Sequence, residues 1–518
     1  MKRFDINALL NAEAWPHPTE DIQLIETHIS WVILTGEYAY KIKKPVDFGF
    51  LDFSTLEKRR YYCEQEVRLN RRLAEDIYLG VVAVVAGDEG LRVGAEGEAV
   101  EYAVQMRQFS QDAQLDVMLA AGKLEPRHMD AIAKMVADFH QRIAVADSSM
   151  PYGEPDAVYQ PVEENFLQID EHINTSRYDP RLQALQQWSE SVFGQKKIVF
   201  AQRKQDGYVR ECHGDMHLRN LMWWPPGEAG RPQAFDCIEF NDSLRWIDVI
   251  SEVAFLVMDL QDRKQGELAN RFLNSWLEIT GDYRGLAVLP FYLCYRAMVR
   301  AKVSVLRLQQ AGISETEAKQ ALDEFESYIE LAESYSRPAS PKLIIMRGLS
   351  ASGKSSVSSA LLERTGAIRI RSDVERKRLF AAKEAAPQRQ GINSGIYSPE
   401  ISEKTYKHLC TLAEVIINAG YSVIVDAAFL KQSQRQLFIE LANRLGVDFR
   451  IIETTAPAEV LRQRIAQRRN DVSDADSAVL TYQLAHYRPL TAEEKPFSRV
   501  LDTQTRVDMP ALAQWLGV

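Results

Sequence analysis

Short apolar runs alternate with helical patterns over the last third of the chain. Apolar runs of strand length lie at residues 342–347, 367–371, 422–425, 449–454 and 499–502. Between them, apolar residues recur with helical spacing at residues 354–363, 402–419, 432–445 and 457–469, as in amphipathic helices. Regular alternation of strands and helices predicts an α/β domain with a mainly parallel sheet covered by helices.

Residues 1–110 show a different pattern, in which strand-like runs are close together and one charged helical segment intervenes. Strands are predicted at residues 30–34, 38–43, 81–85 and 102–106, and a helix from Thr55 to Ala74. The first two strands flank a turn with Gly36 and read as a hairpin. Helical periodicity dominates from Leu115 to Tyr335. This predicts a two-lobed α+β domain, with a small lobe at residues 1–110 and a helical lobe at residues 111–337.

The boundary between these two patterns is marked by residues 333–342. That segment contains two prolines and three serines, and it separates the helical pattern of residues 316–335 from the strand that begins at Lys342. Proline and serine clusters interrupt regular structure. The sequence therefore predicts a first domain at residues 1–337 and a second domain at residues 338–518.

Composition excludes several classes of protein. The chain has 518 residues, of which 46% are hydrophobic and 26% charged, as in folded multidomain proteins. No apolar run reaches the ~18 residues of a membrane span, and the N-terminus lacks the apolar run of a signal peptide. Five scattered cysteines without a CxxC pair suit packing positions in a reducing compartment better than disulfides or zinc. We expect a cytoplasmic protein without a membrane partner.

Charge is distributed unevenly along the chain. The net charge is −10, with the excess of acidic residues in the first domain and a modest excess of basic residues in the second. An acidic first domain repels nucleic acid, whereas a basic second domain suits a protein that handles phosphate.

A glycine-rich motif gives the strongest chemical signal. Residues 348–355, Gly-Leu-Ser-Ala-Ser-Gly-Lys-Ser, match GxxxxGK[ST] between a predicted strand and a predicted helix, which is the context of a phosphate-binding P-loop. Backbone N–H groups and the helix N-terminus would face the phosphates of ATP. Lys354 would contact the β- and γ-phosphates, and Ser355 would bind Mg²⁺. The predicted ATP-binding residues are Gly348, Ser350, Ser352, Gly353, Lys354, Ser355 and Ser356.

Charged residues that follow the later strands of this domain predict the rest of its site. Asp373 comes just after the second strand, where it could act as a general base or cap a helix. Arg376 could hold a phosphate or a substrate carboxylate. Asp426 ends the third strand, as a ligand of Mg²⁺ through water or as a structural residue. Arg464 and Arg468 lie on an arginine-rich helix that could close over the nucleotide or simply face solvent.

The second domain resembles the P-loop small-molecule and polynucleotide 5′-kinases, including zeta-toxin-like and gluconate-kinase-like enzymes. The resemblance rests on GxxxxGKS, on the D-x-x-R of Asp373 and Arg376, and on the arginine-rich helix. It implies that Asp373 is the general base. A guanine-reading NKxD motif does not occur in the sequence, which disfavours a GTPase.

The first domain carries a second chemical motif. Residues 213–220 read H-G-D-x-H-x-x-N, and Asp236 follows on a predicted strand segment, residues 233–239. Phosphoryl transfer needs a carboxylate beside the acceptor hydroxyl and oxygen ligands for Mg²⁺. Asp215 fits the first role, and Asn220 and Asp236 fit the second. These residues resemble the aminoglycoside phosphotransferase family, whose fold is that of protein kinases. The resemblance implies that Asp215 is the catalytic aspartate and that Asn220 and Asp236 bind metal.

The small lobe should supply a lysine for the ATP phosphates and a glutamate that holds it. Lys41 and Lys43 lie on one face of the second hairpin strand, two residues apart. Lys41 takes the position that the resemblance implies, with Lys43 as the alternate. Glu66 is the best partner on the following helix, with Glu64 second. The sequence departs from the kinase pattern in lacking a GxGxxG loop over the phosphates.

For several neighbouring residues we favour a structural role over a catalytic one. His213 and His217 should brace the catalytic loop by hydrogen bonds, and Asp248 should cap a helix or brace a loop. Glu239 is left open, because it could either touch the metal or face solvent.

The chain as a whole resembles bacterial fusions of an aminoglycoside-phosphotransferase-like domain with a P-loop kinase-like domain. This implies two centres that use ATP and Mg²⁺ and phosphorylate hydroxyls of small molecules, with sugars or their derivatives as candidates. One alternative is a regulator in which one domain binds ATP without turnover. Another is a kinase of nucleic-acid ends, or a toxin-like enzyme, in the second domain, although basic residues interleaved with aromatic ones are missing there. Oligomeric state cannot be deduced from the sequence.

Overall fold

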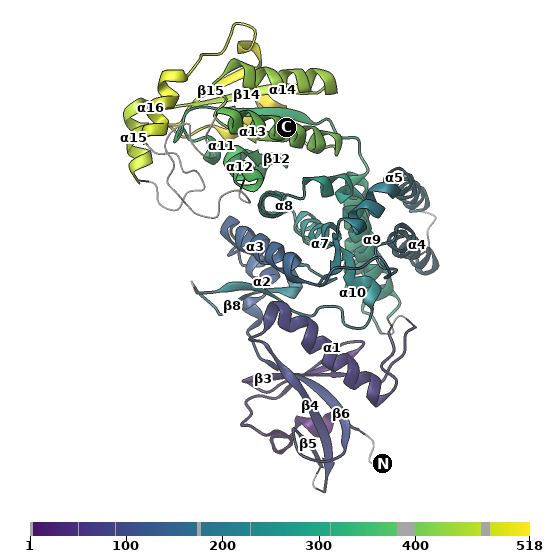
Figure 1. Ribbon diagram of the computed structural model, residues 1–518. Helices are drawn as coiled ribbons and strands as arrows, with labels where there is room; N and C mark the ends of the chain where they lie inside the picture. Colours follow the sequence, from purple (N-terminus) through teal and green to yellow (C-terminus); the bar gives the residue numbers. More distant parts are fainter. Residues whose placement is uncertain are drawn as a thin grey trace. The chain divides into compact units, whose positions relative to one another are not determined.

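The computed structural model describes residues 4–49, 51–88, 90–173, 178–227, 229–310, 312–380, 399–467 and 477–517 (Figure 1). Its contacts divide the chain into two compact units. Unit 1 comprises residues 1–164 and 200–259, and unit 2 comprises residues 165–199 and 260–518. Residues 260–337, which the sequence assigns to the first domain, therefore group with the P-loop region by their contacts. The domain boundary near residue 338 stays a prediction.

Unit 1 begins with a six-stranded sheet in which all neighbouring strands are antiparallel. The strand order is β1-β2-β3-β6-β4-β5. The strands are β1 Gln23–Glu26, β2 Ser30–Leu34, β3 Tyr38–Lys43, β4 Tyr78–Gly87, β5 Gly90–Val93 and β6 Ala99–Arg107. The predicted hairpin is confirmed, because β2 pairs with β3 and Ser30 lies opposite Lys43.

Helix α1, Leu56–Ala74, lies against this sheet and contacts β4 and β6 (Figure 1). The side chain of Thr55 accepts a hydrogen bond from the Lys58 amide and caps the helix, as short hydroxyl side chains do at helix starts. Cys63, Glu66 and Val67 lie on its buried face. A carboxylate buried between helix and sheet needs a partner.

The remainder of unit 1 consists of helices and two short strand pairs. Its elements are α2 Leu115–Ala120, α3 Pro126–Arg142, β7 Val209–Glu211, β8 Leu221–Trp224, β9 Arg231–Ala234, α6 Asp242–Arg245 and β10 Trp246–Asp248. Strand β7 pairs with β10, and β8 pairs with β9. Three helices contain residues of both units: α4 Pro155–His172, α5 Asp179–Gln205 and α7 Val249–Asp262.

Unit 2 contains three helices before the P-loop region. They are α8 Gly266–Thr280, α9 Leu289–Leu308 and α10 Glu315–Tyr335, with the short 3-10 helix η6 Tyr283–Ala287 after α8. Helices α9 and α10 pack along each other. Ser314 and Glu317 form a capping box at the start of α10, which satisfies the first amides of the helix.

The rest of unit 2 is a five-stranded parallel sheet with helices around it (Figure 1). The strands, in the order β12-β13-β11-β14-β15, are β11 Lys342–Arg347, β12 Ile368–Arg371, β13 Val423–Asp426, β14 Asp448–Thr455 and β15 Ser498–Asp502. The helices are α11 Lys354–Thr365, α12 Ser372–Phe380, α13 Pro399–Asn418, α14 Gln432–Leu445, α15 Ala458–Gln467, α16 Ser477–His486 and α17 Met509–Leu516. All residues of β13 are buried, as in parallel sheets covered on both faces.

The predicted classes are confirmed at the level of architecture: an antiparallel sheet followed by helices in the first region, and a parallel sheet with helices around it in the second. One prediction of detail is wrong: the strand at residues 233–239 ends at Ala234, because Asp236 has φ +61° and a left-handed residue leaves the ladder. Asp373 lies just past the second strand of the parallel sheet, as predicted, in the first turn of α12, a helix that was not predicted. None of the helices in the described ranges combines the length and hydropathy of a membrane span.

Buried ion pairs brace the P-loop domain. Arg435 on α14 is fully buried and forms two hydrogen bonds with the Glu494 carboxylate, at 2.6 and 2.9 Å. Arg444, on the same helix, pairs with Glu414 at the surface.

We predict that Arg435→Ala lowers the free energy of unfolding by about 3–5 kcal/mol, because it leaves the Glu494 carboxylate buried without its cation. Arg444→Ala is the matched control and should cost no more than about 1 kcal/mol, since exposed pairs contribute little. Urea denaturation followed by circular dichroism measures both. Equal effects of the two substitutions would contradict a structural role for the buried pair.

Candidate active sites

In unit 1, three elements bring Lys41, Glu66 and Asp236 together. The Lys41 ammonium on β3 lies 2.9 Å from the Glu66 carboxylate on α1 and 2.7 Å from the Asp236 carboxylate, which follows β9. Glu66 is fully buried, whereas the Asp236 side chain is 49% exposed. The arrangement presents a cation and a carboxylate side by side at a surface that solvent reaches.

Lys43 occupies a different place from Lys41. Its side chain is 1% exposed and its ammonium contacts Glu66 at 2.7 Å and also Glu239. Glu239, for which contact with the metal and exposure to solvent were both left open, is buried and pairs with Lys43. Burial opposes ionisation of Glu66, yet the charges of Lys41 and Lys43 lower its pKa to about 2. This geometry supports Lys41 as the phosphate-binding lysine and gives Lys43 a structural task.

The predicted catalytic loop, residues 212–220, lies between β7 and β8. The Asn220 amide nitrogen donates to the backbone oxygen and the carboxylate of Asp215, at 3.0 and 2.9 Å. His217 Nε2 lies 3.4 Å from the same carboxylate. The structure thus joins Asp215 and Asn220 in one loop.

The loop is also joined to the segment that carries Asp236. The Phe235 amide donates to the Asn220 carbonyl at 3.0 Å, and the Ile238 amide donates to the His213 carbonyl at 3.2 Å. The Asp236 amide donates to the Tyr78 hydroxyl at 3.2 Å. These bonds hold Asp236 in its left-handed conformation. They also hold the segment of Asp236 against the loop of Asn220, the other predicted metal ligand.

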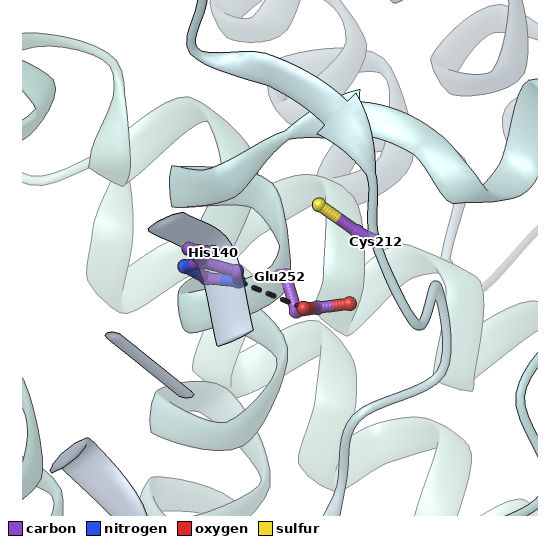
Figure 2. Close-up of side chains that lie close together, drawn as sticks. All are labelled: His140, Cys212 and Glu252. Atoms are coloured by element: carbon purple, nitrogen blue, oxygen red, sulfur yellow. Dashed lines mark hydrogen bonds and ion pairs between the residues drawn. The ribbon is translucent and has the colours of Figure 1, made fainter. Parts of the chain in front are cut away.

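A buried carboxylate holds the loop from behind (Figure 2). Glu252 on α7 accepts hydrogen bonds from the amides of His213 and Gly214, at 2.6 and 2.9 Å, and its other oxygen pairs with His140 Nε2 at 2.8 Å. Figure 2 shows that Cys212 lies beside this pair, and the three possible ligand atoms are within 4.8 Å of one another.

The contacts of this cluster brace the loop. Both oxygens of Glu252 take part in hydrogen bonds within the protein, and burial raises the pKa of the Cys212 thiol. Burial lowers the pKa of His213, whose Nε2 lies 2.9 Å from the Phe235 carbonyl. These contacts match the bracing role predicted for His213. Asp248, likewise, forms two hydrogen bonds with Arg203, at 2.6 and 2.8 Å.

In unit 2, residues 348–353 form a tight cradle between β11 and α11. Gly348 has φ +147°, and a Cβ atom there would lie 2.5 Å from the Thr454 carbonyl oxygen. The Ser352 hydroxyl is hydrogen-bonded to the Thr454 hydroxyl at 2.7 Å. Gly353 (φ +88°) leads into α11. Only glycine combines such backbone angles with so little space.

Side chains predicted to hold phosphate and Mg²⁺ meet at this cradle. The Lys354 ammonium donates to the carbonyls of Gly348 and Leu349, at 3.0 and 2.9 Å. The Ser355 hydroxyl donates to Asp426 at 3.0 Å, and so does that of Ser358, at 3.1 Å. The end of β13 thus places a carboxylate beside the hydroxyl of the P-loop serine.

A cavity of about 660 Å³ opens in front of the cradle. Its lining includes Gly353, Lys354, Ser355, Ser356 and, from the segment after β15, residues 503–509. Arg464 closes one side by donating to the Ala351 carbonyl at 3.1 Å and the Thr503 carbonyl at 2.7 Å. The predicted lid residue Arg464 thus lies at the site.

Two other predicted site residues, Ser350 and Arg376, contact protein groups. The Ser350 amide donates to Gln483 on α16 at 2.7 Å, so this N–H is directed at a protein group. The Arg376 guanidinium lies 3.2 Å from the Asp373 carboxylate on the same turn of α12. Arg468 lies outside the described residues.

Two residues that the structure places in or behind these sites, Thr503 and Glu252, were not identified from the sequence. Thr503 follows the last strand of the parallel sheet, where ligands bind, and that position could have identified it. Glu252, on an apolar helix far along the chain from the loop, carried no such signal.

Both sites fit a nucleotide with a divalent cation. The cradle of unit 2 combines backbone N–H groups, a lysine and a helix start, which together suit phosphates. The oxygens of Ser355 and Asp426, and those of Asn220 and Asp236 in unit 1, are the hard ligands that Mg²⁺ prefers.

A comparison with protein families agrees with the P-loop described in unit 2. The AAA_33 family of AAA domains matches residues 343–490. The chain is 30% identical to the uncharacterized protein Rv2004c of Mycobacterium tuberculosis over 470 aligned residues. The alignment covers 89% of this chain and 90% of the relative. The chain belongs to the family of this mycobacterial protein. The alignment extends over both regions of the chain, so the mycobacterial protein also contains both regions.

Similar solved structures fall into two groups. The amicoumacin kinase hAmiN, in complex with AMP-PNP, Ca²⁺ and Ami, is 16% identical, with a TM-score of 0.40, and covers 63% of this chain and 94% of its own. An unliganded sugar kinase from Janibacter sp. is 20% identical, with a TM-score of 0.27, and covers 35% of this chain and 96% of its own.

We predict that Gly348→Ala lowers nucleotide affinity of the unit 2 site by about tenfold or more, because the added methyl group clashes with Thr454 and distorts the cradle. Gly266→Ala, at a position with no atom near the added methyl group, is the control. Titration with a fluorescent ATP analogue in a Lys41→Met background, which weakens nucleotide binding in unit 1, measures the affinity of the unit 2 site. Unchanged affinity in Gly348→Ala would show that the cradle is not where phosphate binds.

We predict opposite outcomes for the two lysines of unit 1. Lys41→Met should lower transfer at this site about 100-fold while costing about 1 kcal/mol of stability, because Glu66 keeps Lys43 and Asp236 reaches solvent. Lys43→Met should cost about 3–5 kcal/mol, because it leaves the buried Glu239 carboxylate without the lysine that pairs with it. Thermal unfolding and a transfer assay separate the two effects. A larger loss of stability in Lys41→Met would reverse the assignment.

Proposed function

We propose that the chain is a bifunctional ATP-dependent kinase, in which each region transfers the γ-phosphate of ATP to a hydroxyl group of a small molecule. The observation that carries the proposal is the repetition of one arrangement on two folds. Each region holds a lysine, oxygen groups that could bind a cation, and a further carboxylate on an adjoining segment: Lys41, Asn220, Asp236 and Asp215 in unit 1, and Lys354, Ser355, Asp426 and Asp373 in unit 2. Kinase-like regions of both kinds support phosphotransferase activity in general, and the acceptors and double activity are our inference.

In unit 1, Asp215 acts as the base. The acceptor oxygen attacks the γ-phosphorus, Asp215 takes the hydroxyl proton, and the bond to the β–γ bridging oxygen breaks to release ADP. Asn220 holds the Asp215 carboxylate at 2.9 Å and so orients it for this proton transfer. Lys41 positions the α- and β-phosphates, while Glu66 holds Lys41 in place. When bound, Mg²⁺ would be held by Asn220 and Asp236 and would offset negative charge on the phosphates.

In unit 2, Asp373 has the corresponding role. It lies at the carboxyl end of β12, on the sheet edge where the P-loop also lies, and Arg376 holds its carboxylate at 3.2 Å. Lys354 leaves its two carbonyl partners to contact the phosphates, and Arg464 covers the nucleotide from the α15 side. Ser355 and Asp426 would hold Mg²⁺ there.

An ATP-gated regulator is the second candidate, favoured by one observation. The Lys354 ammonium is satisfied by the carbonyls of its own loop, so the cradle is stable without phosphate and could serve as a sensor. In that case ATP would bind in unit 2 without losing its γ-phosphate.

We predict that wild type, incubated with γ-labelled ATP and a metabolite mixture, labels two classes of acceptor. Asp215→Asn should lower one by about 100-fold or more through loss of the base. Lys354→Ala should lower the other by a similar factor, about 100-fold, through loss of charge on the phosphates. Chromatography of the labelled products measures both.

The controls are Asp138→Asn and Lys404→Ala, which change exposed residues on α3 and α13 and should leave both products unchanged. If wild type labels a single class of acceptor, and only one of Asp215→Asn and Lys354→Ala loses that label, the result would favour the regulator. No label in any acceptor would refute both kinase assignments.

A further inference from the structure

One face of helix α8 contacts the P-loop domain through a regular row of polar residues. Asn270, Asn274 and Glu278 are spaced four residues apart and so lie on one side of the helix; we call them the α8 row. All three contact residues 363–378, and both sets belong to unit 2.

Asn274 completes the edge of the parallel sheet. Strand β12 is an edge strand, so one side of its backbone has no neighbouring strand. The Asn274 side chain donates to the Ala367 carbonyl at 3.2 Å and accepts from the Arg369 amide at 2.8 Å. A side-chain amide thereby imitates the two bonds of a neighbouring strand, and Asn274 itself is 4% exposed. An edge so covered is held in a fixed position.

Glu278 secures the same strand one turn later. Its carboxylate pairs with Arg369 and with Arg371, each at 3.2 Å, and its backbone oxygen accepts from Arg378 on α12. All these side chains are mostly buried. Breaking such a pair leaves the two arginines facing each other without a counter-ion.

The strand and helix held in this way carry the acceptor side of the proposed P-loop site. Strand β12 ends at Arg371, and Asp373 follows in the first turn of α12. On the same turn, Glu375 is 1% exposed and receives the Tyr283 hydroxyl of η6 at 3.4 Å. Two anchors from residues before the P-loop domain therefore bracket Asp373.

We propose that the α8 row positions Asp373 for transfer, so that catalysis at the P-loop depends on a helix outside the P-loop domain. This inference rests on the proposed role of Asp373 as the base. The hydrogen bonds and ion pairs of the row described above reach residues 363–378, beyond the cradle at residues 348–355, so the row acts through backbone position. Its loss should therefore affect turnover and leave nucleotide binding unchanged.

The test measures P-loop transfer in full-length protein that carries Asp215→Asn, which silences the other site. Asn274→Ala and Glu278→Gln should each lower kcat about tenfold or more, since small displacements of a reacting group are costly. KM for ATP should stay within about twofold, because binding and turnover separate when only the transition state is affected. Glu267→Gln, an exposed residue of the same helix, is the matched control and should change neither constant.

A charge exchange distinguishes positioning from general instability. Glu278→Arg should lose activity, and Glu278→Arg combined with Arg371→Glu should regain most of it, because the ion pair is restored with its charges reversed. Unchanged kcat in Asn274→Ala, or equal losses in kcat and in ATP affinity, would overturn the proposal.

Hydrogen exchange separates this proposal from the function on which it rests. In Asn274→Ala, amides of residues 368–380 should exchange about tenfold faster or more, and those of β11 should not change. If wild type transfers no phosphate but this exchange pattern is seen, the base assignment fails and the anchoring stands. If exchange at residues 368–380 is unchanged, the anchoring itself is refuted.

Discussion

Charges that leave solvent must be paired, and this constraint shapes both sites. Glu66 is buried only because Lys41 and Lys43 reach it from β3, and Lys43 is buried only because Glu239 completes its neutralisation. The pairs join the sheet, helix α1 and the segment after β9. The half-exposed carboxylate of Asp236 is thus placed beside a lysine that the network holds still.

Local sequence patterns were sufficient for the scaffold. A GxxxxGKS motif between a strand and a helix specifies its own geometry, because glycine angles and the helix start leave few alternatives. The hairpin with Gly36 and the strands of the parallel sheet were also predictable from periodicity. At the site, the residues within one loop, such as Asp215 and Asn220, could be paired from spacing alone.

Contacts between distant segments were not predictable in the same way. Glu252 reaches the amides of residues 213 and 214 from a helix whose apolar pattern gives no reason to single it out. Asn274 bonds to an edge strand that lies 95 residues further along. Helix α12 escaped prediction because it starts without a turn after β12 and is mainly charged, so neither periodicity nor a breaker marks it.

The central claim is that one chain holds two separate nucleotide sites of different construction. Native mass spectrometry with Mg²⁺ and a non-hydrolysable ATP analogue counts them directly, without knowledge of either acceptor. The account predicts two analogue molecules per chain in wild type, and one in a variant whose P-loop lysine is replaced. A single bound molecule in wild type, or none, would contradict it.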